Sequence, residues 1–210
     1  MRAWKRVRFA GLCVIALVAG CGSLSKPYPV KESFGITAPA PARVGTTHAG
    51  VLRVERVRLT PPYDERTFVY RTSDTRYQSD YYAEFVADPG RLLTAELVRS
   101  LGAAGVFETV AEPDAGMDTA YRLETTVTEL SADARDPLAP AATVRARFLL
   151  LHDGRDTTRV VGEWVIEGSE RATDASPAAI AAAWGVALGR VTGELAERLS
   201  ETPLVSATAR

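Results

Sequence analysis

The sequence has little cysteine, little histidine and no excess of charge of either sign. Its 210 residues include two Cys and two His, with 25 Lys and Arg against 26 Asp and Glu. Two cysteines are too few for a disulfide-built mini-protein, and the balanced charge argues against a nucleic-acid binder and an acidic disordered tail. A mean hydropathy of −0.04 excludes a protein with many membrane spans. An ordinary folded chain of one domain, or two small ones, remains.

The motifs of common catalytic sites are also missing. The chain has no G-x-S-x-G, H-E-x-x-H, C-x-x-C or P-loop. Its two imidazoles, His48 and His152, lie in segments typical of exposed turns. Glu163 and Glu167 are typical of a solvated strand face rather than of an acid–base pair. The sequence therefore predicts no enzyme, no metal site and no cofactor, although a hydrolase site assembled from distant residues would leave no motif.

Residues 1–20 resemble a bacterial lipoprotein signal peptide. Basic residues precede an apolar run over 9–19, which as a helix would span about 16 Å and is too short for a bilayer core of ~30 Å. The run ends in the lipobox-like pattern Leu-Val-Ala-Gly before Cys21. This resemblance implies cleavage before Cys21, a thioether-linked diacylglycerol on its thiol and a further acyl chain, such as palmitate, on its amine. The alternative is an ordinary signal peptide in which Cys21 is incidental.

Residues 21–32 are interpreted as the lipidated cysteine and a flexible tether. Pro27 and Pro29 favour extended backbone, which gives the tether a reach of about 36–40 Å. Asp directly after the lipidated cysteine favours retention in the inner membrane of enterobacteria, and Gly22 stands there instead. By resemblance, the protein is therefore expected on the outer membrane, lipid-anchored and facing the periplasm.

Two segments carry the signals of amphipathic helices. Asp88-Pro89 supplies an N-cap and a proline in the first turn, and leucines then recur on one face over 93–101. Ser176-Pro177 repeats this start. A longer apolar stripe follows, made up of Ile180, Trp184, Leu188, Val191, Leu195 and Leu199.

Alternating apolar residues predict strands in the rest of the chain. Residues 67–72 and 76–82 predict a hairpin, and three further segments predict an antiparallel meander: 120–130, 143–151 and 159–167. Residues 51–60 predict a strand that has either a bulge or apolar residues on both faces, and shorter strands are expected near Phe34 and Phe107. We therefore expect an α+β fold: a single domain over 33–202, with a mostly antiparallel sheet, two helices packed on one face and a tail at 203–210.

Tyrosine is concentrated in the predicted hairpin, because five of the seven Tyr lie between residues 63 and 82. Tyrosine combines a large flat contact area with a hydroxyl group at modest entropy cost, which suits a protein interface. The alternative is that about half of these rings fill the core beneath the first helix. We predict a partner-binding surface formed by Tyr70, Arg71, Tyr77, Tyr81, Tyr82 and Phe85.

The segment from Tyr70 through Tyr81-Tyr82, Pro89 and Leu101 to Gly105-Val106-Phe107 is similar to the ABC-type transport auxiliary lipoproteins. The strand at 51–59, the lipobox and the proline-rich tether also match this family. Its members are PqiC-like partners of MCE-type lipid transport systems. The resemblance is densest over residues 51–110 and covers most of the chain after the signal peptide.

The resemblance implies a non-catalytic subunit that works with an ATPase, a permease and an MCE-domain protein to move lipids between the two membranes. It also implies that the chain can self-associate as a homo-oligomer. The residues leave alternatives open: a carrier that holds a lipid itself, and an envelope-assembly lipoprotein of other function. No catalytic or cofactor-binding residue is implied, and neither is nucleic acid as a partner.

Overall fold

The computed structural model describes residues 30–117, 119–138, 140–154 and 156–204. The chain divides into two units, Met1–Val30 and Lys31–Arg210, and the described residues belong almost entirely to the second. The expected signal peptide, Cys21 and most of the tether lie outside the described residues, as does the chain after residue 204. The expectations for these segments stay predictions.

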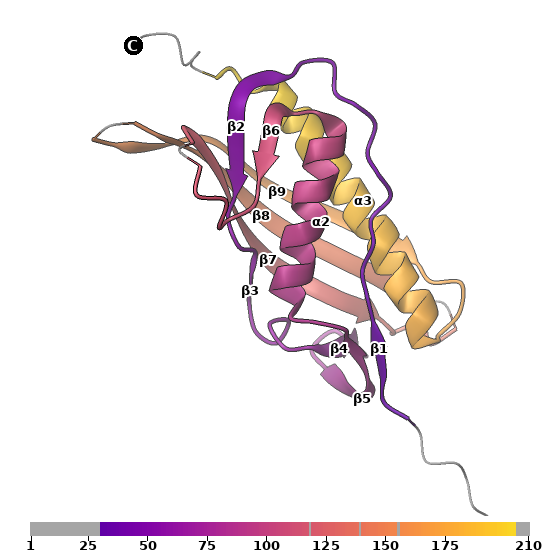
Figure 1. Ribbon diagram of the computed structural model, residues 1–210. Helices are drawn as coiled ribbons and strands as arrows, with labels where there is room; N and C mark the ends of the chain where they lie inside the picture. Colours follow the sequence, from indigo (N-terminus) through magenta and orange to yellow (C-terminus); the bar gives the residue numbers. More distant parts are fainter. Residues whose placement is uncertain (1–29, 118, 139, 155, 205–210) are drawn as a thin grey trace, which may run out of the picture. The chain divides into compact units, whose positions relative to one another are not determined.

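Strand β7 (Tyr121–Asp133) organises the sheet. Along one edge it pairs antiparallel with β8 (Ala141–Asp153). Along the other edge it pairs with three short parallel strands in succession: β2 (His48–Val54), β3 (Arg58–Leu59) and β4 (Thr67–Arg71). The strand expected over 51–60 is therefore two strands, which meet β7 at its start and its middle (Figure 1).

The other strands extend this sheet. β9 (Thr158–Arg171) pairs antiparallel with β8, which confirms the predicted meander, and β6 (Phe107–Ala111) pairs parallel with β2. β5 (Tyr77–Phe85) pairs antiparallel with β4 and confirms the predicted hairpin, and β1 (Glu32–Phe34) lies parallel beside β5. Within the described ranges the nine strands form one mixed sheet that is largely antiparallel.

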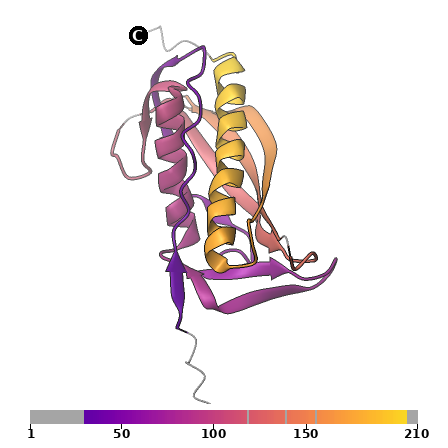
Figure 2. The same ribbon diagram turned by 90° about the vertical axis from the view of Figure 1, so that its right-hand side faces the viewer.

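Both predicted helices are present: α2 (Pro89–Ala104) and α3 (Pro177–Glu201). Each begins at its expected cap, because Asp88 accepts the amide of Arg91 at 2.9 Å and Ser176 accepts that of Ala179 at 3.2 Å. α2 ends at Gly105, whose φ of 70° is the left-handed conformation that favours glycine. The helices lie side by side on one face of the sheet, which confirms the predicted α+β fold (Figures 1 and 2).

The core lies between these helices and the sheet, with Trp184 of α3 at its centre. The Trp184 side chain is fully buried and meets Phe68 of β4 edge-on, with ring centroids 4.7 Å apart. Its ring also lies 5.4 Å from that of Phe85 in β5, and its indole N–H donates to the carbonyl of Ser131 in β7 at 3.0 Å. One side chain therefore joins α3 to three strands.

The opposite face of the meander carries charged pairs across neighbouring strands. Arg147 pairs with Glu163 at 2.8 Å, and Arg145 pairs with Glu167. These contacts confirm the interpretation of both glutamates as residues of a solvated strand face. In the part of the chain that the structure covers, no helix has the length and apolar character needed to cross a membrane.

Residues 35–47 form a strap that runs along the two helices from β1 to β2 (Figure 1). Ile36 and Ala38 of the strap are buried. The peptide groups of Ala38 are held from both sides, because its N–H donates to Glu96 at 2.9 Å and its carbonyl accepts from Arg99. At Gly185 of α3 the strap comes so close that an added Cβ would overlap the carbonyl oxygen of Thr37. The strap, which follows the first strand of the domain, therefore contacts both helices.

Candidate docking surface

The β4–β5 hairpin contains a large bulge, and Asp80 stabilises it. Val69 pairs with Ser79, whereas Thr67 pairs with Glu84, so the chain after Ser79 leaves the regular ladder with β4 and rejoins it at Glu84. One carboxylate oxygen of Asp80 accepts the amides of Tyr82 at 2.7 Å and of Ala83 at 3.1 Å. The bulge places Tyr81 and Tyr82 at the surface.

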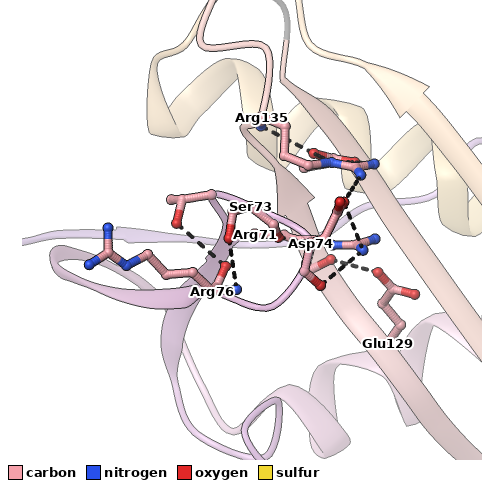
Figure 3. A network of polar contacts seen from close by, with 9 residues as sticks. Arg71, Ser73, Asp74, Arg76, Glu129 and Arg135 are labelled. Atoms are coloured by element: carbon pink, nitrogen blue, oxygen red, sulfur yellow. Dashed lines mark hydrogen bonds and ion pairs between the residues drawn. The ribbon is translucent and has the colours of Figure 1, made fainter.

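A polar network fixes the turn of the hairpin to the end of β7 (Figure 3). Arg135 donates to Asp74 of the turn at 2.6 Å and to both carboxylate oxygens of Asp133. The hydrogen bonds from Arg135 hold the pKa of Asp133 below its usual range. Arg71 donates to the carbonyls of Ser73 at 3.4 Å and Asp74 at 3.3 Å. The turn is therefore held in place before any partner arrives.

The predicted surface residues of the hairpin divide between its two sides. Arg71 and Tyr77 are directly paired across the strands, so their side chains share one side. Tyr77 is 43% exposed, and the pKa of Tyr63 is raised to about 12, mainly by burial and further by the neighbouring Tyr77. Tyr70 pairs with Gln78 and points to the other side. Its hydroxyl donates to Asp80 at 3.0 Å, and burial together with Asp80 raises the pKa of Tyr70 well above its usual range.

Tyr81 and Tyr82 form the most exposed aromatic pair of the described residues. Tyr81 is 74% exposed and Tyr82 is 38% exposed. Their ring centroids lie 5.0 Å apart with the planes at 83°, so that the two rings make a corner. Tyr70 lies beside them in the wall of a shared pocket.

The expectation that Phe85 lies on this surface is wrong. Phe85 is only 2% exposed and packs against Phe68 at 4.8 Å and Trp184 at 5.4 Å. It follows the bulge, where β5 has returned to the regular ladder and its side chain points under the helices. For Phe85, the alternative interpretation of the sequence is correct: this hairpin ring fills the core.

The chain enters the domain beside this hairpin. Lys31, Ser33 and Arg66 all contact the carboxylate of Glu84, next to the three backbone pairs between β1 and β5. The hydrogen bond from Lys31, with further contributions from Arg66 and Ser33, lowers the pKa of Glu84. Sequence reasoning missed Glu84 and Asp80, because a charged residue in a strand pattern normally indicates only solvent exposure.

We predict that acid releases β1 from β5. The pKa of Glu84 is lower in the folded protein than in the unfolded chain, so its contribution is complete above the ordinary Glu pKa of about 4.3 and is lost as the pH falls through the lowered value. Hydrogen exchange measures this through the amide of Val86, which donates to Phe34 of β1 at 2.8 Å. Its protection factor should fall in acid. In the Glu84→Gln variant it should be low at every pH, and an unchanged acid dependence there would refute the assignment.

The rings of the two histidines contact a backbone carbonyl and aromatic rings. His48 lies in β2 rather than in a loop, and its ring is 2.8 Å from the carbonyl of Leu199 and 5.2 Å from the ring of Phe107 by centroids. His152, at the end of β8, faces the ring of Tyr121 at 4.9 Å. Among the residues with described positions, no group of three His, Cys, Asp or Glu is arranged to hold a metal ion.

Comparisons with solved structures recover the same fold. Protein XCC0632 from Xanthomonas campestris, of the DUF330 family, has a TM-score of 0.71 and 22% identity, over 80% of this chain and 94% of that one. The hypothetical protein CT253 from Chlamydia trachomatis has a TM-score of 0.51 and 12% identity, over 73% of this chain and 97% of that one. A search of curated proteins gave no match. At these identities the likeness shows the fold.

The fold and the hairpin define a class: an α+β domain with two helices on one face of a mixed sheet and an aromatic hairpin at the point where the chain enters. The sequence model of the ABC-type transport auxiliary lipoprotein component family matches residues 34–196. The chain belongs to this family, which confirms the resemblance found in the sequence. Members of this family are lipoprotein components of transport systems. The family description gives them an auxiliary role and names no reaction.

Proposed function

We propose that the protein is the non-catalytic auxiliary subunit of an ABC/MCE-type system that transports lipids between membranes. The family match over residues 34–196 is the observation that carries this proposal. The domain itself supports it, because a preformed hairpin on a rigid sheet suits a docking role. The proposed partners are an MCE-domain protein, a permease and an ATPase.

The proposed location is the outer membrane, with the domain in the periplasm. Cleavage after residue 20 and lipidation of Cys21 would leave residues 22–32 as the tether. The described chain supports this arrangement at its first residues, since Val30 is 80% exposed and Lys31 begins the contact with Glu84. Self-association of the domain stays a prediction.

The proposed partner contact is the side of the hairpin that carries Arg71 and Tyr77. The guanidinium of Arg71 is already held by the turn, so binding would immobilise few new rotamers of this side chain. Tyrosine and arginine are also the residues most often found as interface hot spots. Tyr70, Tyr81 and Tyr82 lie around the pocket instead, and their ligand is considered separately below.

Purification of the tagged full-length protein from native membranes in a mild detergent tests the proposed function. Mass spectrometry of the eluate should find an MCE-domain protein together with permease and ATPase subunits. Recovery of lipopolysaccharide-assembly proteins or peptidoglycan in their place would contradict the transport role and favour an envelope-assembly lipoprotein.

The Tyr77→Ala variant tests the docking side in the same purification. We expect the recovery of the MCE-domain protein to fall about tenfold or more, the usual size of a hot-spot effect. Val165→Ala is the matched control, because Val165 is an exposed residue of β9 outside the hairpin. Both variants should keep the wild-type urea midpoint. Equal recovery from wild type and folded Tyr77→Ala would show that this side of the hairpin is not the docking site.

A further inference from the structure

The second side of the hairpin contains a pocket of about 390 Å³. Its walls come from β4, from β5 with its bulge, and from Ala134 just after β7. Aromatic rings and neutral polar groups make up nearly all of it, and Asp80 is the one charged side chain that lines it. The lining residues are Tyr70, Thr72, Gln78, Ser79, Asp80, Tyr81, Tyr82 and Ala134.

The Asp80 carboxylate accepts hydrogen bonds and takes part in no ion pair of the residues that the structure describes. One oxygen accepts two backbone amides, and the other accepts the hydroxyl of Tyr70. A carboxylate offers about four acceptor positions, so one position stays open on the oxygen that faces Tyr70. Among the ion pairs of the described residues, none includes Asp80, whereas Asp74 and Asp133 both pair with Arg135. Within the described part of the chain, the pocket therefore presents a carboxylate that no basic side chain pairs with.

The aromatic walls favour a ligand of the opposite charge. Tyr81 and Tyr82 meet at 83°, which presents a ring face and a ring edge at one corner. The face of an aromatic ring attracts a cation, and cages of aromatic rings recognise alkylammonium groups in proteins. A carboxylate beside such rings adds the attraction of an opposite charge. The hydroxyl of Tyr70 donates to the Asp80 carboxylate at 3.0 Å and joins the third ring of the pocket to it.

The position of the pocket indicates which ammonium group it meets. β1 joins the chain to β5 at Ala83–Phe85, directly after the bulge. Cys21 and Lys31 are ten residues apart, a reach of at most about 33–36 Å and on average roughly 16–19 Å for a flexible chain. With the proposed anchor at Cys21, a pocket joined to a tether of this length lies within reach of lipid headgroups.

We propose that the pocket formed by Tyr70, Asp80, Tyr81 and Tyr82 binds the ammonium group of a zwitterionic phospholipid headgroup, ethanolamine or choline. The choice of a lipid over a protein amine rests on the proposed anchor at Cys21. The ammonium sits in the corner of the two exposed tyrosines beside Asp80, and the phosphate faces solvent. Ethanolamine donates a hydrogen bond to the carboxylate, whereas choline, which has no N–H, is attracted by charge alone. Such a contact orients the domain on its membrane and leaves Arg71 and Tyr77 to the partner.

Titration of the full-length lipoprotein in an uncharged detergent tests this proposal. The protein carries 3-fluorotyrosine, and ¹⁹F NMR follows the ring of Tyr81 as dihexanoyl phosphatidylethanolamine is added. We expect a saturable shift with the ethanolamine lipid and with its choline analogue. Dihexanoyl phosphatidylglycerol, which has the same phosphate and chains but no ammonium, should bind at least tenfold more weakly. Equal binding of the glycerol lipid would overturn the proposal.

Two variants and one further ligand complete the test. Tyr82→Leu keeps an apolar wall but removes the ring, and it should lower the affinity for the ethanolamine lipid about tenfold. Tyr77→Leu, on the other side of the hairpin, should change the affinity less than twofold, and both variants must keep the wild-type urea midpoint. Tighter binding of N-acetyl-lysine methylamide than of the ethanolamine lipid would assign the pocket to a protein amine and overturn the lipid assignment. Because purified protein is used without transporter subunits, failure here is distinct from failure of the partner purification.

Discussion

Replacing Trp184 with alanine should lower the free energy of unfolding by about 3–5 kcal/mol, the largest effect we expect from one substitution. The indole is fully buried, and its removal leaves a cavity between α3 and the strands that carry Phe68 and Phe85. It also leaves the carbonyl of Ser131 without the indole N–H. Because natural domains are stable by only about 5–15 kcal/mol, the variant should lose a large part of its folded population.

Trp184→Phe separates packing from hydrogen bonding in this prediction. It keeps a ring in the core but removes the donor to Ser131, so we expect an intermediate loss of about 1–3 kcal/mol. Urea unfolding of the purified protein measures both variants. A loss below 1 kcal/mol for Trp184→Ala would show that the hairpin and α3 are not joined through this residue.

The second large effect is expected at Gly185, where the strap touches α3. Gly185→Val places a side chain against the backbone of Thr37, where an added Cβ would already overlap the carbonyl oxygen. Overpacking of this kind costs about 1–3 kcal/mol, and we expect the upper part of that range because the obstacle is backbone. Hydrogen exchange should also quicken at the amide of Val44, which bonds the carbonyl of Ala104 at 2.9 Å.

Gly193→Val is the matched control for this prediction. Gly193 lies on the same helix, and an added Cβ there meets no atom within 4 Å. Its unfolding free energy should stay within about 0.5 kcal/mol of wild type. Similar losses in both variants would point to helix propensity as the cause and would contradict a tightly seated strap.

The helices and the meander were predictable because their signals are local. Asp88 and Ser176 cap the helices where the sequence places them, and the stripe from Ile180 to Leu199 is buried along its length. The meander strands alternate with period two because one face is covered by α3 and the other carries charged pairs. In each case the residues that determine the structure are neighbours in the sequence.

The parallel pairings and the hairpin pocket were not predictable in this way. The succession of β2, β3 and β4 along β7 joins segments that are far apart in the chain, and short strands carry too few residues to specify a partner. The bulge at Asp80 reverses which hairpin residues face outward, so that Phe85 is buried while Tyr81 is exposed. Such a bulge depends on one carboxylate reaching two amides, and alternation alone does not reveal it.

The docking that we propose between the hairpin and the transporter involves the side that carries Arg71 and Tyr77. Photo-crosslinking in living cells tests this contact, with benzoylphenylalanine in place of Tyr77 and, as control, in place of Val165 of β9. We expect a crosslink from position 77 to an MCE-domain protein and none from position 165. Crosslinks to that protein from position 165 alone would place the docking surface on the meander and contradict the proposed contact.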